Sequence, residues 1–132
     1  MRKVVVLAED NEDLGQVVKS KLEHAALKVI WKKDGGEAWD AIVSQHPALA
    51  ILDANLPSVD GFELLRRIKA SDDMRQTPVI MVSALGYGGY VGDALRNGAS
   101  DFVVRPFRAG HLLSRVKHFL KPNPHAARNG AH

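Results

Sequence analysis

The sequence predicts an open α/β fold, in which helices cover both faces of one parallel β-sheet. Short apolar runs suited to strands alternate with segments whose apolar residues recur at helical spacing. The central runs VVVLA, ALAILD and VIMVSA are apolar at nearly every position, which is typical of parallel strands buried on both faces. A chain of 132 residues, 45% of them hydrophobic, is long enough for one domain with its own core, which we place at residues 1–121.

The strands and helices are predicted in alternating order. The strands are Lys3–Ala8, Lys28–Lys32, Leu49–Asp53, Val79–Ser83 and Phe102–Val104. Segments with a clear helical period are Leu14–Ala25, Gly36–Gln45, Gly61–Ala70 and Ala109–Leu120. The residues of the first helix expected to face the core are Leu14, Val17, Val18, Leu22 and Ala25. Those of the second helix are Ala38, Trp39, Ile42 and Val43. Trp31 and Trp39 are interpreted as packing residues.

Two helix starts are predicted from side chains that accept hydrogen bonds from backbone amides. Asp13, with Gln16 three residues later, fits a cap for the first helix. Asp60, Gly61 and Glu63 fit a turn followed by a capping box at the start of the third helix.

The segment between residues 85 and 97 is predicted to form the weakest helix. LGYGGYVGDALRN contains four glycines, and each costs about 1 kcal/mol relative to alanine inside a helix. We therefore expect the fourth helix to be short, to start late or to be mobile. Residues 122–132 contain two prolines and no apolar period, and are expected to form a disordered tail.

Composition and charge exclude several functions. The absence of cysteine excludes disulfides, thiolate metal sites and thiol redox chemistry. No apolar run approaches the roughly 18 residues that span a bilayer, and the N-terminal run is too short for a signal peptide, so a cytoplasmic location is expected. The net charge of +3 is spread over dispersed basic residues without a DNA-reading motif, so direct nucleic-acid binding is not expected.

Acidic residues are concentrated where strands end. Within VVVLAEDNED, Glu9 and Asp10 follow the first strand, and Asp53 closes the third. Open parallel sheets bind ligands beyond the carboxyl ends of their strands, so these three carboxylates are expected to share one crevice. Two like unit charges about 4 Å apart repel by roughly 4 kcal/mol at an effective dielectric constant near 20, so the cluster requires a cation.

The ligand chemistry of this crevice favours a small divalent ion. Carboxylate oxygens favour Mg²⁺ and admit Mn²⁺. Ser83, at the end of the fourth strand, would add a hydroxyl, and Arg105, after the fifth, would add a fixed positive charge. The crevice therefore suits a tetrahedral anion held on a metal.

Four stretches, in this order, carry a resemblance to a known family: VVVLAED, AILDANLPSVDGFELLRRIK, TPVIMVSA and LRNGASDFVVRPF. With them, residues 3 to about 120 resemble a response-regulator receiver domain of bacterial two-component signalling. The resemblance implies a flavodoxin-like, doubly wound sheet of five parallel strands in the order 2-1-3-4-5.

The resemblance also implies roles for individual residues. Asp53 matches the phosphoacceptor, and Glu9 and Asp10 match the pair that binds the metal with it. Asn55 matches the position whose backbone carbonyl completes the metal shell. Ser83 matches the switch hydroxyl that also binds the phosphoryl group.

The remaining matched positions lie on and after the fifth strand. Phe102 matches the aromatic residue that turns inward on phosphorylation, and Pro106 matches a proline that follows a cis peptide bond. Arg105 stands where the family usually has lysine. Its planar guanidinium would either clamp the phosphoryl group or pair with Asp53 beforehand, and the sequence leaves both open.

By this resemblance the protein would be a signalling domain rather than an enzyme, with only self-catalysed phosphoryl acceptance and hydrolysis. A sensor histidine kinase or phosphotransfer protein would supply the phosphoryl group, and an unidentified output protein would be reached by protein–protein contacts. The alternative is a pseudo-receiver that docks partners independently of phosphorylation. A flavin carrier is disfavoured because AEDNED would repel a phosphate, and a metal-dependent phosphatase because its nucleophile would follow the first strand.

Overall fold

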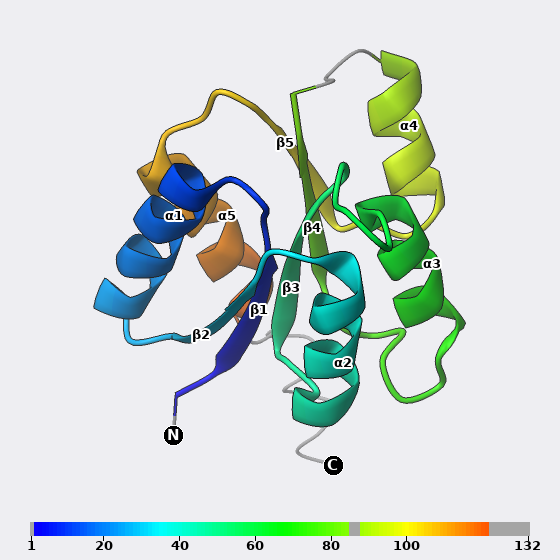
Figure 1. Ribbon diagram of the computed structural model, residues 1–132, viewed down its shortest axis with the longest axis horizontal. Coiled ribbons are helices and arrows are strands. Elements are labelled where there is room, and N and C mark those ends of the chain that lie inside the picture. The colour runs from blue at the N-terminus through cyan, green and yellow to red at the C-terminus, as the bar shows by residue number, and fades with distance from the viewer. Residues whose placement is uncertain (1, 85–87, 122–132) are drawn as a thin grey trace.

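The computed structural model describes residues 2–84 and 88–121, and this part of the chain forms one five-stranded parallel sheet between two layers of helices (Figure 1). The strands are β1 (Val4–Ala8), β2 (Lys28–Lys32), β3 (Leu49–Asp53), β4 (Val79–Ser83) and β5 (Asp101–Val104). The helices are α1 (Glu12–His24), α2 (Gly35–Gln45), α3 (Gly61–Ala70), α4 (Gly88–Arg96) and α5 (Ala109–Leu120). The strand order β2-β1-β3-β4-β5 confirms the predicted flavodoxin-like fold.

Helices cover both faces of the sheet, as the apolar runs predict. α1 and α5 lie on one face, and α2, α3 and α4 lie on the other (Figure 1). In β1, Val5 and Leu7 belong to the core cluster under α1 and α5, whereas Val6 and Ala8 belong to the cluster on the opposite face. Successive side chains of a strand point to opposite faces, so a strand covered on both sides must be apolar throughout.

The start of α1 corrects one prediction. The helix begins at Glu12, and its cap is Asn11, whose side-chain oxygen accepts a hydrogen bond from the backbone amide of Leu14 at 2.9 Å. Asp13 is therefore a first-turn residue rather than the cap, and its charge lies near the positive end of the helix dipole.

Two predicted core residues lie at the surface instead. The exposed fraction is 55% for Val17 and 44% for Val43. Each is followed or preceded by a buried residue, Val18 and Ile42 respectively. Adjacent helical residues are about 100° apart around the axis, so only one of each pair can face the sheet.

The start of α3 confirms one half of the predicted capping box. The Asp60 side chain accepts a hydrogen bond from the backbone amide of Glu63 at 2.9 Å. The Glu63 carboxylate, in contrast, accepts hydrogen bonds from Arg66 and Arg67 on the surface of the helix.

In the described part of the chain α4 has nine residues, fewer than any other helix there, in agreement with the prediction of a short helix. The earlier part of that prediction, residues 85–87, and the predicted tail at 122–132 lie outside the described residues. The peptide bond between Arg105 and Pro106 is cis, as predicted. Within residues 2–84 and 88–121, no helix is both long enough and apolar enough to cross a membrane.

Candidate functional site

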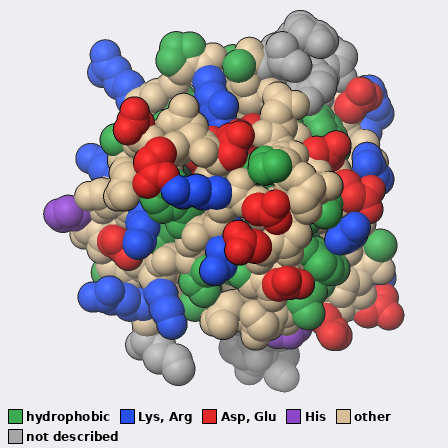
Figure 2. Space-filling model, in the orientation of Figure 1, with side chains coloured by type: hydrophobic (Ala, Val, Ile, Leu, Met, Phe, Trp, Pro, Cys, Tyr) green, Lys and Arg blue, Asp and Glu red, His purple; other side chains and the backbone are tan. Residues whose placement is uncertain are grey.

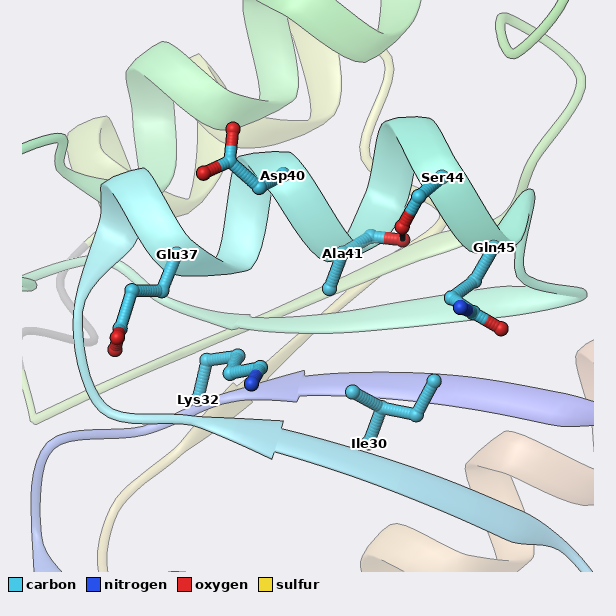
Figure 3. Close-up of a pocket in the computed structure, with 7 residues that line it drawn as sticks. All are labelled: Ile30, Lys32, Glu37, Asp40, Ala41, Ser44 and Gln45. Carbon is cyan, nitrogen blue, oxygen red and sulfur yellow. Dashed lines mark hydrogen bonds between the residues drawn. The ribbon is translucent and has the colours of Figure 1, made fainter.

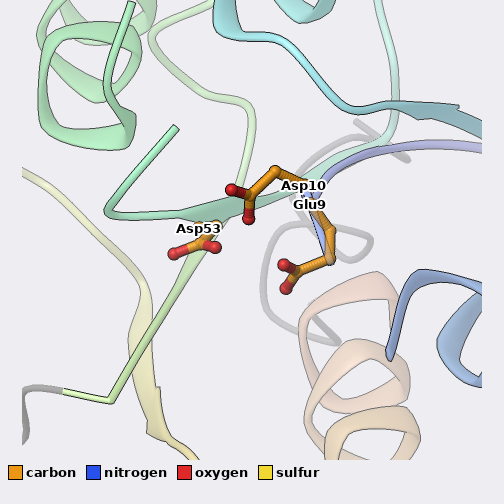
Figure 4. Close-up of side chains that lie close together, drawn as sticks. All are labelled: Glu9, Asp10 and Asp53. Atoms are coloured by element: carbon orange, nitrogen blue, oxygen red, sulfur yellow. The ribbon is translucent and has the colours of Figure 1, made fainter. Parts of the chain in front are cut away.

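The predicted acids meet at the carboxyl edge of the sheet. β1 and β3 are neighbours, with Ala8 beside Leu52, so the residues that follow these two positions lie next to each other. Glu9, Asp10 and Asp53 each offer an oxygen, and these three oxygens lie within 4.8 Å of one another. Figure 4 shows the three side chains gathered at the ends of the two strands. The structure thus confirms the predicted convergence.

Burial distinguishes the three acids. Glu9 is 2% exposed and Asp53 is 1% exposed, whereas Asp10 is exposed. The pKa of Glu9 is raised to about 7, first by burial and then by the negative charge of Asp53. The backbone amide of Asn11, which donates to Glu9 Oε2 at 3.1 Å, and the guanidinium of Arg105 partly offset this rise in the pKa.

Arg105 brings a positive charge directly between the two buried acids. Its Nη2 forms ion pairs with Glu9 Oε1 and with Asp53 Oδ2. Burial lowers the pKa of this guanidinium, but the charges of Asp53 and Glu9 outweigh that effect and raise it. Of the two arrangements that the sequence leaves open for Arg105, the pairing with Asp53 is the one seen in this structure.

One N–H group of the Arg105 guanidinium, at Nε, forms no hydrogen bond within the described residues. The Nε atom is buried. A buried donor without a partner costs free energy, so a hydrogen bond to this N–H would be favourable. The Arg105 backbone is fixed independently, because its amide donates to the Ser83 carbonyl at 2.9 Å.

The other predicted residues surround this centre at different depths. Ser83 is fully buried at the end of β4, the strand next to β3. The backbone amide of Asn55 donates to Asp53 Oδ1 at 3.0 Å and so orients the carboxylate. Phe102 lies farther from the carboxyl edge of the sheet, beside Met81 on β4. Its half-buried side chain packs against the core on the face covered by α2 and α3.

Two residues that support the acids were not identified from the sequence. The indole Nε1 of Trp31 donates to the backbone carbonyl of Glu9 at 2.8 Å, so Trp31 does more than fill space. Gly61 lies so close to β3 that a Cβ there would be 2.2 Å from the Asp53 carbonyl oxygen. Neither contact has a local sequence signal, since each depends on which strands and loops become neighbours.

A separate pocket of about 370 Å³ lies between α2 and β2 (Figure 3). It is lined by Ile30, Lys32, Glu37, Asp40, Ala41, Ser44 and Gln45, none of which belongs to the predicted site. The acidic crevice, rather than this pocket, contains the chemistry-bearing residues that the sequence singles out.

The fold and site together define a doubly wound α/β domain with an acidic crevice at the carboxyl edge of its sheet. The response regulator receiver domain family matches residues 5–117, and the chain belongs to this family. It is a receiver domain of the kind found in two-component response regulators, a class that is generally not made up of classical enzymes and that typically binds Mg²⁺ at an acidic pocket.

Individual relatives agree with this assignment. The chain is 35% identical over 124 residues to the transcriptional regulatory protein CrdR of Helicobacter pylori, covering 94% of this chain and 58% of that protein. It is 35% identical over 117 residues to the phosphate regulon transcriptional regulatory protein PhoB of Rhizobium meliloti, covering 89% of this chain and 52% of that protein. The chain thus spans little more than half the length of these curated relatives.

A solved structure supports the same conclusion. The signal receiver domain of a putative Luxo repressor protein from Vibrio parahaemolyticus superposes with a TM-score of 0.84 at 29% identity, covering 91% of each chain.

Proposed function

We propose that Asp53 is the phosphoacceptor of this receiver domain and that Glu9, Asp10, Asp53 and the Asn55 backbone carbonyl bind Mg²⁺ beside it. The observation that supports this assignment is the convergence of three carboxylates, two of them buried, at the ends of β1 and β3. Such a donor set fits a hard divalent cation, and Mn²⁺ would bind to the same oxygens. The Arg105 guanidinium between Glu9 and Asp53 is consistent with a crevice that requires positive charge.

The proposed reaction requires little covalent machinery from the protein. An oxygen of the ionised Asp53 carboxylate forms a bond to phosphorus while the bond from phosphorus to the donor's imidazole nitrogen breaks, and that nitrogen keeps the electron pair. The Asn55 amide, on Oδ1, holds the carboxylate in orientation during the transfer. A bound Mg²⁺ supplies neutralisation of the negative charge on the transferring oxygens.

Arg105 must rearrange in this reaction. Its Nη2 is paired with Asp53 Oδ2 and Glu9 Oε1, so the guanidinium has to leave at least one of these oxygens as the metal and the phosphoryl group bind. The buried Nε–H would then gain a phosphoryl oxygen as its acceptor. Arg105 thus acts as a counter-ion before phosphorylation and as a phosphoryl ligand afterwards.

Ser83 and Phe102 are proposed to transmit the change. The Ser83 hydroxyl would bind another phosphoryl oxygen, and its movement would make room for Phe102 to turn inward from β5. The surface around α4 and β5 would change as a result, and partners would read that change.

The proposed donor is a sensor histidine kinase or phosphotransfer protein, and the proposed output is an unidentified protein reached by direct contact in the cytoplasm. Figure 2 shows acidic and basic side chains interspersed over the face in view, without a broad basic area. On this face there is therefore no basic area of the kind that binds nucleic acid.

The test is to titrate Mg²⁺ into the protein, add acetyl phosphate and measure the mass of the intact chain and of its peptides. We expect the mass of one phosphoryl group on Asp53, dependent on Mg²⁺, and no label in Asp53→Asn. Asp60→Asn is the matched control, because asparagine also caps a helix and Asp60 lies outside the crevice. A folded chain that takes no label at millimolar Mg²⁺ would contradict the proposal and favour phosphorylation-independent docking.

A further inference from the structure

Both the amide and the carbonyl of Glu9 form hydrogen bonds with residues of β2. Its amide donates to the Lys32 carbonyl at 3.0 Å, and its carbonyl accepts from Trp31 Nε1 at 2.8 Å. β2 is an edge strand and contributes no acid to the crevice. Its contribution to the site is therefore made through the position of the loop between β1 and α1.

The Trp31 ring is itself fixed in place. It lies against Gly15 on α1 so closely that a Cβ at Gly15 would be 2.0 Å from Trp31 Cζ2. The ammonium group of Lys33 lies 5.4 Å from the ring centroid, and the same group pairs with Glu12 in the first turn of α1. The half-buried indole thus lies between β2 and the start of α1, and its N–H points to the Glu9 carbonyl.

We propose that Trp31 is a positioning residue for the metal-binding acids, an inference that rests on the proposed function. The peptide bond is planar, so the hydrogen bond to the Glu9 carbonyl also fixes the plane from which Asp10 extends. Asp10 is exposed, and one of its carboxylate oxygens lies within 4.8 Å of oxygens of Glu9 and Asp53. Trp31 therefore sets how the two acids after β1 are directed toward Asp53.

The size of the effect follows from other metal sites. Groups that orient the ligands of a metal typically contribute about 10- to 100-fold to its affinity. Because Trp31 acts on the backbone rather than on a carboxylate, we expect a loss of Mg²⁺ affinity of about tenfold, at the low end of that range.

The sharpest variant replaces Trp31 with β-(3-benzothienyl)alanine, which has sulfur in place of the indole N–H and keeps a ring of nearly the same shape against Gly15. Trp31→Phe is a second variant that also removes the donor. Trp39→Phe is the matched control, because Trp39 lies on α2, packs against the core of the opposite face and stacks with Arg67. Mg²⁺ dissociation constants are measured by calorimetry, and urea unfolding of the metal-free proteins reports stability.

Fluorescence reports which of the two tryptophans lies near the site that binds Mg²⁺. In Trp39→Phe the emission comes from Trp31, and we expect it to change on addition of Mg²⁺ with the calorimetric dissociation constant. In Trp31→Phe the remaining emission comes from Trp39 and should not respond. Both Trp31 variants should bind Mg²⁺ about tenfold more weakly, and Trp39→Phe should bind as the unaltered chain does.

The outcomes separate this inference from the proposed function. If the unaltered chain binds Mg²⁺ and both Trp31 variants bind it equally well, Trp31 only packs and the inference is wrong, while the metal site stands. If the Trp31 variants lose stability in urea without losing affinity, the inference is likewise wrong. If the unaltered chain itself binds no Mg²⁺, the proposed metal site fails and the positioning role fails with it.

Discussion

All five residues of β3 are buried, but Leu49–Leu52 and Asp53 differ in what burial does to them. The apolar residues stabilise the fold when they are removed from water. The Asp53 carboxylate, like that of Glu9, loses hydration and is tolerated because Arg105 pairs with it. The sheet interior is thus stable in itself, whereas the carboxyl edge is stable only with a cation among its acids. Truncation of a side chain should therefore lower stability most in the sheet interior, whereas pH and Mg²⁺ should change stability through the acids at the carboxyl edge.

The largest effect is expected from truncation of the interior. Leu64 on α3 is completely buried against the sheet, so Leu64→Ala should lower the free energy of unfolding by about 4 kcal/mol through lost burial and a cavity. Urea denaturation measures this loss. Mg²⁺ affinity of the folded fraction should stay unchanged, because Leu64 contacts none of the acids through hydrogen bonds or charge. A loss below about 1 kcal/mol would show that the core is less tightly packed than described.

The acids at the carboxyl edge should make the free energy of unfolding depend on pH, so that stability falls as pH rises. The pKa of Glu9 is raised from 4.5 to about 7, so between these values the folded chain holds a proton that the unfolded chain has released. The unfolded state binds fewer protons in this window, and the free energy of unfolding therefore decreases with increasing pH. The total decrease attributable to Glu9 is of the order of 3 kcal/mol in metal-free protein.

Urea denaturation between pH 4.5 and pH 8 tests this pH dependence, with Glu9→Gln as the control. The glutamine side chain cannot ionise, so the decrease assigned to Glu9 should disappear. Added Mg²⁺ should also flatten the profile in the unaltered chain, since a metal favours the ionised carboxylate. A chain whose stability rises steadily over this interval would contradict the raised pKa of Glu9.

The sequence predicts most of the sheet because burial on both faces leaves a local mark, the uninterrupted apolar run. It also predicts the meeting of Glu9 and Asp53, since parallel strands place their carboxyl ends at one edge. The start of a helix is predicted less accurately: the sequence pattern predicts the cap of α1 at Asp13, but the structure places it two residues earlier, at Asn11. The role of Trp31 depends on the register between β1 and β2, which no local pattern contains.

The ion pairs of Arg105 likewise cannot be predicted from a local sequence pattern. The sequence identifies a cation after β5, but its pairing with Glu9 and Asp53 spans 96 and 52 residues. Whether a guanidinium pairs with the acids or awaits the phosphoryl group depends on the distances across the crevice. These distances are set by the pairing of β1, β3, β4 and β5 in one sheet.

The smallest effect is expected when the cation at the edge is changed but its charge is kept. Arg105→Lys places a compact, strongly hydrated ammonium beside Glu9 and Asp53 and removes the Nε donor that has no partner in the described part of the chain. Labelling by acetyl phosphate should persist, because positive charge remains at the site. The conformational response should differ, because an ammonium has neither the Nε–H nor the planar fork of donors that the guanidinium offers to phosphoryl oxygens.

Hydrogen exchange of β5 and α4, with and without beryllofluoride as a phosphoryl mimic, measures that response beside the labelling yield. Arg67→Lys is the matched control, since Arg67 pairs with Glu63 on the surface of α3 and should leave both readings unchanged. If Arg105→Lys and the unaltered chain label equally and change exchange equally, the guanidinium contributes only its charge. The edge would then need a cation but no particular cation, and the coupling to the switch would have to originate from Ser83 alone.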